Sequence, residues 1–267
     1  MLLQPPVVVG LEIAGTACRL ACDDRDFAAR LARRYAAFPP ADEPAPLAVE
    51  ITLTSHPASA LVAEWSGPYA RVTGRGSALA IAGLGFSGAF DEATGRGTIT
   101  QPPDHEPLET LLTAIYASRL LGDGGCMLHA AAIVGRAGAL VFFGPSGSGK
   151  TTVAELIGED VITDEITAIR PAAGAYVVSS VPWRGQPRAA PLAGLFRLRQ
   201  ATTTAITPLS PRDAVRALLP SVFFCRADGA EFSRFLESAD RMARAVPAYE
   251  LAFTRDRSFW DVAPGAA

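Results

Sequence analysis

The sequence contains very little lysine. Lys150 is the only one, and all other basic side chains apart from histidine are arginines. The formal net charge is -3 at pH 7. Proteins that bind nucleic acid usually carry a surplus of basic residues, so this charge balance argues against a nucleic-acid partner. The single ammonium side chain lies in a glycine-rich run, 144-GPSGSGKTT-152.

Long apolar runs are also missing. No stretch approaches the ~20 consecutive apolar residues that a membrane-spanning helix needs. The first residues, MLLQPPVVVGLEIAG, lack the basic segment and long apolar core of a secretory signal. We therefore expect a cytoplasmic protein without a membrane partner. Its 267 residues, 49% of them hydrophobic, are enough to bury a substantial core.

Cysteine is scarce, and its spacing does not form a metal site. The four cysteines are Cys18, Cys22, Cys126 and Cys225. Cys18 and Cys22 are four residues apart, but no second Cys/His pair completes a tetrahedral ligand set. On a strand they point to one face. We predict small buried thiols that stay reduced, as is usual in the cytosol.

The N-terminal region, residues 1–105, predicts a β-rich α+β domain. Its helix is indicated by the apolar spacing of Phe27, Leu31 and Tyr35 and by a capping Asp23 or Asp24. The other expected elements are a strand or hairpin broken at Gly10 and Gly15 (7–22), a strand over 47–55 and several hairpin strands over 62–101.

The C-terminal region, residues 106–267, predicts alternating strands and helices. A helix over 108–121 stops at Gly122, and later helices follow a Ser210-Pro211 cap and cover about 229–245. The expected strands are 126–134, 138–143, 161–163 continued by 166–171, 175–180, 193–200 and 247–253, with a short helix over 150–157.

The glycine-rich run matches the phosphate-binding pattern G-x4-G-K-[ST] at every fixed position. It lies between an apolar strand and a helix start, as that pattern requires. Glycines let backbone N–H groups converge on phosphate oxygens, and the helix N-terminus adds partial positive charge. The alternative is a flexible surface turn. The predicted nucleotide-binding residues are Gly144, Pro145, Ser146, Gly147, Ser148, Gly149, Lys150, Thr151 and Thr152.

An acidic pair follows closely. Asp164 and Glu165 come 14 and 15 residues after Lys150, at the end of a short strand. A carboxylate beside a phosphate loop can hold Mg²⁺ or accept a proton from an attacking hydroxyl. The alternative is a solvated turn. Upstream, His129 lies in the apolar run 128-LHAAAIV-134, where a structural role is the competing interpretation.

Together, 128-LHAAAIV, GALVFFGPSGSGKTTVAELI and VITDEITAI-169 resemble the catalytic core of HPr serine kinases and their shorter relatives. The resemblance is strong over about 45 residues and extends weakly to the C-terminus. It implies a phosphoenolpyruvate-carboxykinase-like P-loop fold of the α/β (α+β) class. It also implies ATP and Mg²⁺ as cofactors.

The resemblance implies roles for single residues. Lys150 would contact the terminal phosphates, while Thr151, Asp164 and Glu165 would hold Mg²⁺. Asp164 would also be the general base, and His129 would hydrogen-bond to it and position it. The implied reaction transfers the γ-phosphoryl group to a serine-type hydroxyl of a protein, peptide or small molecule, and the sequence leaves homo-oligomerisation open.

Two positions differ from that family and motivate an alternative. Glu165 replaces the usual second aspartate, and Pro145 stands where true HPr kinases usually carry an acidic residue. A nucleotide-binding regulatory module without transfer activity is therefore the second hypothesis. A simple ATPase ranks third, because no water-positioning residue is visible.

Other residues receive plainer predictions. Arg184 and Arg188 either clamp an acceptor or are solvated. We expect surface positions for His56 and His105, and core positions for Phe223, Phe224 and Trp260.

Overall fold

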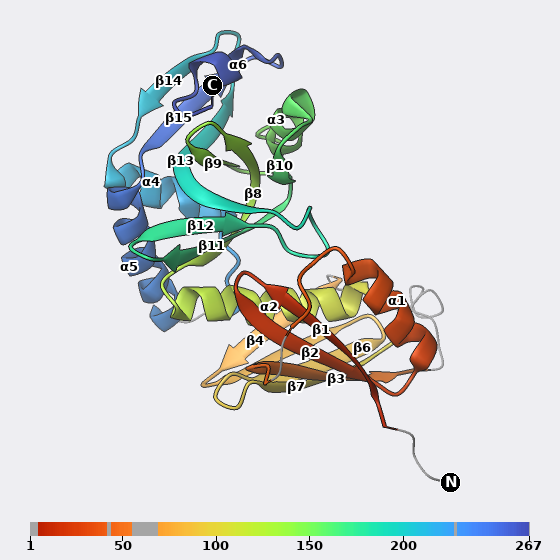
Figure 1. Cartoon of the computed structure of the whole chain (residues 1–267). Helices are drawn as coiled ribbons and strands as arrows, with labels where there is room; N and C mark the ends of the chain where they lie inside the picture. The colour runs from red at the N-terminus through yellow and green to blue at the C-terminus, as the bar shows by residue number, and fades with distance from the viewer. Residues whose placement is uncertain (1–4, 42–43, 55–68, 227–228, 267) are drawn as a thin grey trace. The chain divides into compact units, whose positions relative to one another are not determined.

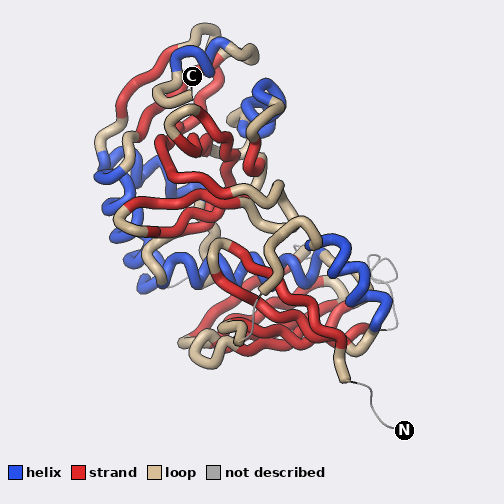
Figure 2. The backbone as a smooth tube through the Cα atoms, viewed as in Figure 1, coloured by secondary structure: helices blue, strands red, loops and turns tan. Residues whose placement is uncertain are grey.

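The computed structural model describes residues 5–41, 44–54, 69–226 and 229–266. The chain divides into two compact units. The first comprises Met1–Arg119 and Phe224–Asp228, and the second Leu120–Phe223 and Gly229–Ala267. Each unit combines helices with mixed sheet, which confirms the predicted α+β class (Figures 1 and 2). In the described residues, no helix is both long and apolar enough to cross a membrane. His56 lies outside the described residues.

The first unit is built on a sheet of seven described strands. Parallel pairing joins β2 to β3 and β3 to β7, and the remaining neighbours are antiparallel. The strand order is β1 (Val7–Ile13), β2 (Thr16–Cys22), β3 (Leu47–Leu53), β7 (Arg96–Gln101), β6 (Phe86–Asp91), β5 (Ala78–Gly83) and β4 (Ala70–Arg75).

Helix α1 (Arg25–Tyr35) contacts β1 and β2 of this sheet. Its N-cap is Asp24, whose carboxylate accepts a hydrogen bond from the Phe27 amide at 2.7 Å. Phe27, Leu31 and Tyr35 are all buried, as the helical spacing predicted. Local capping and periodicity therefore specify this helix.

The β1–β2 hairpin corrects one expectation. Gly10 does not break the strand, because it pairs with Arg19 inside the ladder. The turn is made by Ala14 and Gly15, which both have positive φ, as a tight two-residue hairpin turn requires. Cys18 and Cys22 are both buried on β2, as predicted.

Helix α2 (Glu106–Gly122) begins in the first unit and ends in the second. Its N-terminal half carries Glu109, a buried carboxylate that accepts hydrogen bonds from Arg34 and Tyr35 of α1. The predicted stop is confirmed, because Gly122 is its last residue.

The second unit contains two sheets that share the long strands β8 (Cys126–Gly135) and β13 (Ala189–Gln200). The first part of each strand belongs to a sheet with β11 (Ile166–Ala172) and β12 (Ala175–Ser179). The later part of each pairs with β9 (Gly138–Phe143). The second sheet is completed by β10 (Val161–Thr163), β15 (Ala248–Phe253) and β14 (Ala205–Pro208).

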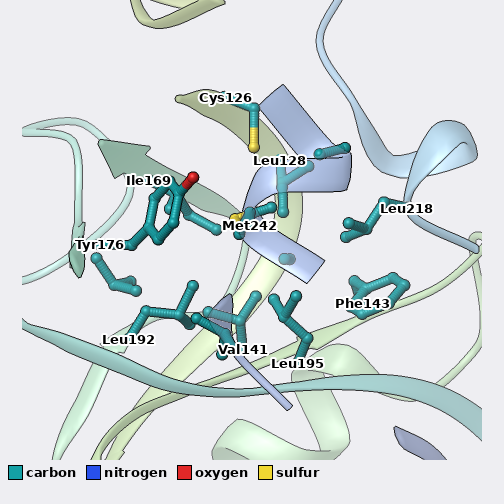
Figure 3. Close-up of a cluster of buried hydrophobic side chains, with 14 of the residues drawn as sticks. Cys126, Leu128, Val141, Phe143, Ile169, Tyr176, Leu192, Leu195, Leu218 and Met242 are labelled. Carbon is teal, nitrogen blue, oxygen red and sulfur yellow. The ribbon is translucent and has the colours of Figure 1, made fainter. Parts of the chain in front are cut away.

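Two apolar clusters hold this unit together. One includes residues from the two sheets together with α4 (Pro211–Leu218) and α5 (Gly229–Ala245); Figure 3 shows Val141, Phe143, Leu195, Leu218 and Met242 in it. The other joins β9, β13 and β15 to α3 (Lys150–Ile157) and α6 (Ser258–Val262). Each large aliphatic side chain that is fully buried contributes about 1.5–3 kcal/mol.

Some expectations for the second unit were wrong or incomplete. Phe224 is 37% exposed rather than core, and Phe223 and Trp260 are only partly buried. Strand β14 and helix α6 were not predicted. Strand β11 does not simply continue β10: the two pair with different parts of β8, and the Asp164–Glu165 turn separates them.

Candidate functional site

The glycine-rich loop connects β9 to α3. Strand β9 is nearly fully buried, and α3 begins at Lys150, so the loop occupies the strand-to-helix position that the motif predicts. The amide of Val153 donates to the Gly149 carbonyl at 2.9 Å, which closes the first helical turn. The first amides of α3 have no carbonyl within the helix to which they can donate.

Gly149 is the position where only glycine fits. Its φ is 107°, and a Cβ there would lie 2.5 Å from Cζ of Phe253 on β15. Any side chain would therefore collide with a buried ring of the apolar core as well as strain the backbone. The core thus holds the loop backbone close to the sheet.

Lys150 turns back into the loop. Its Nζ donates to the Gly144 carbonyl at 3.0 Å and to the Pro145 carbonyl at 3.2 Å. The residue is only 6% exposed, and burial lowers its pKa from the usual 10.5. Both of these acceptors are neutral carbonyls, so these contacts give the buried ammonium no counter-charge. An anion bound beside it would supply one.

The loop also contains a buried hydroxyl, that of Ser148. Its Oγ is buried and has no hydrogen-bond partner in the described structure. Buried hydroxyls are nearly always paired. This one packs against the start of the loop, where a Cβ on Gly144 would lie 2.8 Å from it, and Ser148 does not line the cavity described below.

The acidic pair lies at the turn between β10 and β11. The Thr163 hydroxyl holds this turn. Its Oγ1 accepts hydrogen bonds from the amides of Glu165 and Ile166, both at 3.3 Å, and donates one to the Arg184 carbonyl. Asp164 is exposed, and Glu165 is partly buried. The Glu165 carboxylate forms an ion pair with Arg184, with Oε2 and Nε 3.2 Å apart.

His129 lies on β8 directly opposite Ile166, beside this turn. The next residue, Ala130, donates its amide to the Glu165 carbonyl at 3.1 Å. Burial, helped by the Lys150 charge, lowers the pKa of His129 below 6.5, while Glu165 opposes the shift. His129 thus interacts with Glu165. Among the described residues, it forms no hydrogen bond to Asp164, although the resemblance implies one.

These segments, which are distant in sequence, line one cavity of about 390 Å³. The loop and α3 contribute Ser146, Gly147, Gly149, Lys150, Thr151 and Thr152. His129, Asp164 and Glu165 face it as well. The structure thus brings the predicted loop, acidic pair and histidine to the same cavity.

Two further residues line this cavity and were not predicted. Gln200, at the end of β13, donates through Nε2 to the Gly147 carbonyl at 2.7 Å. Arg255 donates to Gln200 Oε1 at 3.5 Å and adds a second cationic side chain. Neither residue lies in a motif, and both are more than 50 residues from the loop, so only the fold reveals them.

These features fit a nucleotide phosphate chain. The lysine ammonium and the start of α3 lie in one loop, and both border the cavity. Among the described residues, no three His, Cys, Asp or Glu side chains cluster as a metal site. Magnesium in P-loop proteins takes ligands from a threonine, one carboxylate and phosphate oxygens, so Thr151 and Asp164 would suffice.

Comparisons with known proteins add no family assignment. No protein-family model matches the chain, and no curated protein matches it.

Proposed function

We propose that this protein is an ATP- and Mg²⁺-dependent phosphotransferase that moves the γ-phosphoryl group to a serine-type hydroxyl. One observation carries the proposal: a single cavity is bordered by the phosphate-loop residues and by Asp164, Glu165 and His129. A nucleotide-binding loop alone is common to many protein classes. A free carboxylate at the same cavity supplies the group that phosphoryl transfer to a hydroxyl requires.

The residues divide the work as follows. Lys150, Arg255 and the amides at the start of α3 bind and orient the phosphate oxygens of ATP. Thr151 and Asp164 are the residues that would hold Mg²⁺, which supplies charge neutralisation when bound. Asp164 also accepts the proton of the acceptor hydroxyl. His129 is a positioning residue whose neutral imidazole lies beside the Glu165 backbone.

Incubation with γ-labelled ATP, Mg²⁺ and a library of serine and threonine peptides tests the proposal. We expect label on peptide with the wild-type protein and a loss of at least ~100-fold with Asp164→Asn, the usual contribution of a general base. Asp240→Asn, a partly exposed carboxylate on α5 that pairs with Arg244 and does not line the cavity, is the matched control and should retain activity. Full transfer activity in Asp164→Asn would reject the assignment.

A nucleotide-binding regulatory module is the second candidate. The ion pair between Glu165 and Arg184 favours it, because it engages a carboxylate that would otherwise be available to a metal. This candidate predicts that MgATP stabilises the fold, by about 2.7 kcal/mol at 100 times Kd, while neither the peptide library nor water receives phosphate.

A further inference from the structure

Asp164 borders two cavities. Besides the nucleotide cavity, it lines a second cavity of about 680 Å³, here called the β10 cavity, whose walls are β10 and residues 185–188. Among the residues that line the two, Asp164 is the only one they share. A molecule in the β10 cavity and a nucleotide in the other would therefore meet at this carboxylate. This inference rests on the proposed function.

Hydrogen bonds fix the walls of the β10 cavity. The Gln186 amide donates to the Ile162 carbonyl at 3.2 Å, and Ser180 donates its hydroxyl to the Gln186 carbonyl. Gly185 is packed so closely that a Cβ would lie 2.5 Å from the Ile162 carbonyl oxygen. The segment is thus attached to the outer edge of β10 through its backbone, while the Gln186 side chain remains exposed.

The charges of the β10 cavity disfavour anionic ligands. Its one cation, Arg188, is already paired with Asp160 at 2.9 Å. Asp164 adds a second carboxylate, so acidic groups outnumber basic ones. A phosphorylated or carboxylated metabolite would meet net repulsion here. The lining residues include no aromatic ring on which a sugar or base could stack.

The remaining walls suit a polypeptide. Val161 and Pro187 offer apolar contacts, and the exposed side-chain amide of Gln186 offers a hydrogen-bond donor and an acceptor. We propose that the β10 cavity binds the phosphoacceptor, and that the acceptor is a serine or threonine in a peptide segment with neutral or basic neighbours. The local carboxylates select against acidic neighbours.

The transfer step balances without a further reactant. The acceptor oxygen forms a bond to the γ-phosphorus of ATP as the bond from that phosphorus to the bridging oxygen breaks. ADP leaves with the electron pair of that bond. The hydroxyl proton passes to the Asp164 carboxylate and then to solvent.

A blocking variant tests the location of the acceptor. Gln186→Trp should fill the β10 cavity, leave the backbone bonds of residue 186 in place and keep the nucleotide cavity unchanged. With a serine peptide flanked by arginine and alanine, we expect at least a tenfold rise in peptide KM, about 1.4 kcal/mol, with an unchanged KM for ATP. Ser233→Trp, at an exposed site on α5, is the matched control.

The outcomes separate this inference from the proposed function. Peptide KM unchanged in Gln186→Trp, with transfer intact, would overturn the acceptor site and leave the kinase standing. MgATP binding to the wild-type protein without label on any peptide would overturn the peptide acceptor but leave nucleotide binding standing. No MgATP binding at all would overturn both.

Asp160 tests the charge preference. Asp160→Asn removes a carboxylate at a residue whose φ is 59°, a conformation that asparagine tolerates well. We expect the wild-type protein to have a higher kcat/KM for arginine-flanked than for glutamate-flanked serine peptides. In the variant, most of the difference between the two kcat/KM values should be lost. A wild-type preference for glutamate-flanked peptides, or a ratio unchanged by the substitution, would contradict the assignment.

Discussion

Nζ of Lys150 lies 3.0 Å from the carbonyl oxygen of Gly144, six residues earlier in the same loop. The only lysine ammonium of the chain therefore closes the loop on itself, with neutral carbonyl oxygens as its acceptors. This geometry leaves the positive charge available to an arriving phosphate.

Chemical labelling can exploit the single lysine. An amine-reactive reagent has only Lys150 and the N-terminal amine to modify. Because burial lowers the pKa of Lys150, more of it is neutral and nucleophilic near pH 9 than of an ordinary lysine. We expect mass spectrometry to find slow labelling, limited by burial, that MgATP suppresses and adenosine does not. Equal labelling with and without MgATP would contradict phosphate binding at Lys150.

Two loop glycines differ in the space around them, which gives a matched pair of variants. Gly149→Ala places a Cβ 2.5 Å from Phe253, whereas Gly147→Ala meets no atom within 4 Å, although both positions have positive φ. Overpacking should cost Gly149→Ala about 1–3 kcal/mol beyond the backbone strain that both share. Thermal unfolding measures the difference, and equal melting temperatures would show that Phe253 does not constrain the loop.

The elements that could be predicted from the sequence are those that interactions between nearby residues specify. Helix α4 was predicted because Ser210 caps it locally, accepting the Asp213 amide at 3.2 Å. Helix α6 was missed because it has no side-chain cap and only five residues, so its burial against the β-sheet decides it. Caps and apolar spacing act within a few residues of the sequence and can be read from it. Packing brings together residues that are distant in sequence, so it cannot.

The same distinction applies to the site. The loop and the acidic pair each form a short local motif, so the sequence predicted both. Gln200 contacts Gly147 across 53 residues, and no local pattern signals that contact. The ion pair of Arg184 with Glu165 is likewise set by the 180–188 segment folding back on β10.

The pH dependence of stability should report His129. Its pKa is lowered in the folded protein, so the unfolded chain binds more protons as pH falls below 6.5. Stability contributed by the neutral imidazole is therefore present above pH 6.5 and lost below it. His129→Asn should show a smaller decrease in melting temperature from pH 7.5 to 5.5 than wild type. His105→Asn, at a half-exposed histidine beside Asp104, is the control, and an effect confined to it would contradict this account.

The ion pair between Glu165 and Arg184 separates two roles for Glu165. If Glu165 helps to hold Mg²⁺, Glu165→Gln should raise the Mg²⁺ concentration needed for half-maximal activity by about tenfold, the effect of losing one charged contact. Arg184→Gln should instead lower it, because the carboxylate is released. Unchanged Mg²⁺ dependence in both variants would restrict Glu165 to a structural role.

The central claim is that the loop from Gly144 to Thr151 binds the phosphate chain of a nucleotide. Isothermal titration of the wild-type protein and Lys150→Ala with MgATP, with adenosine as a parallel titrant, tests it most directly. We predict saturable heat with MgATP, at least ~10-fold weaker binding in the variant, as expected for one charged hydrogen-bond donor, and no measurable heat with adenosine. Absence of heat with MgATP, or equal affinity in the variant, would contradict the account.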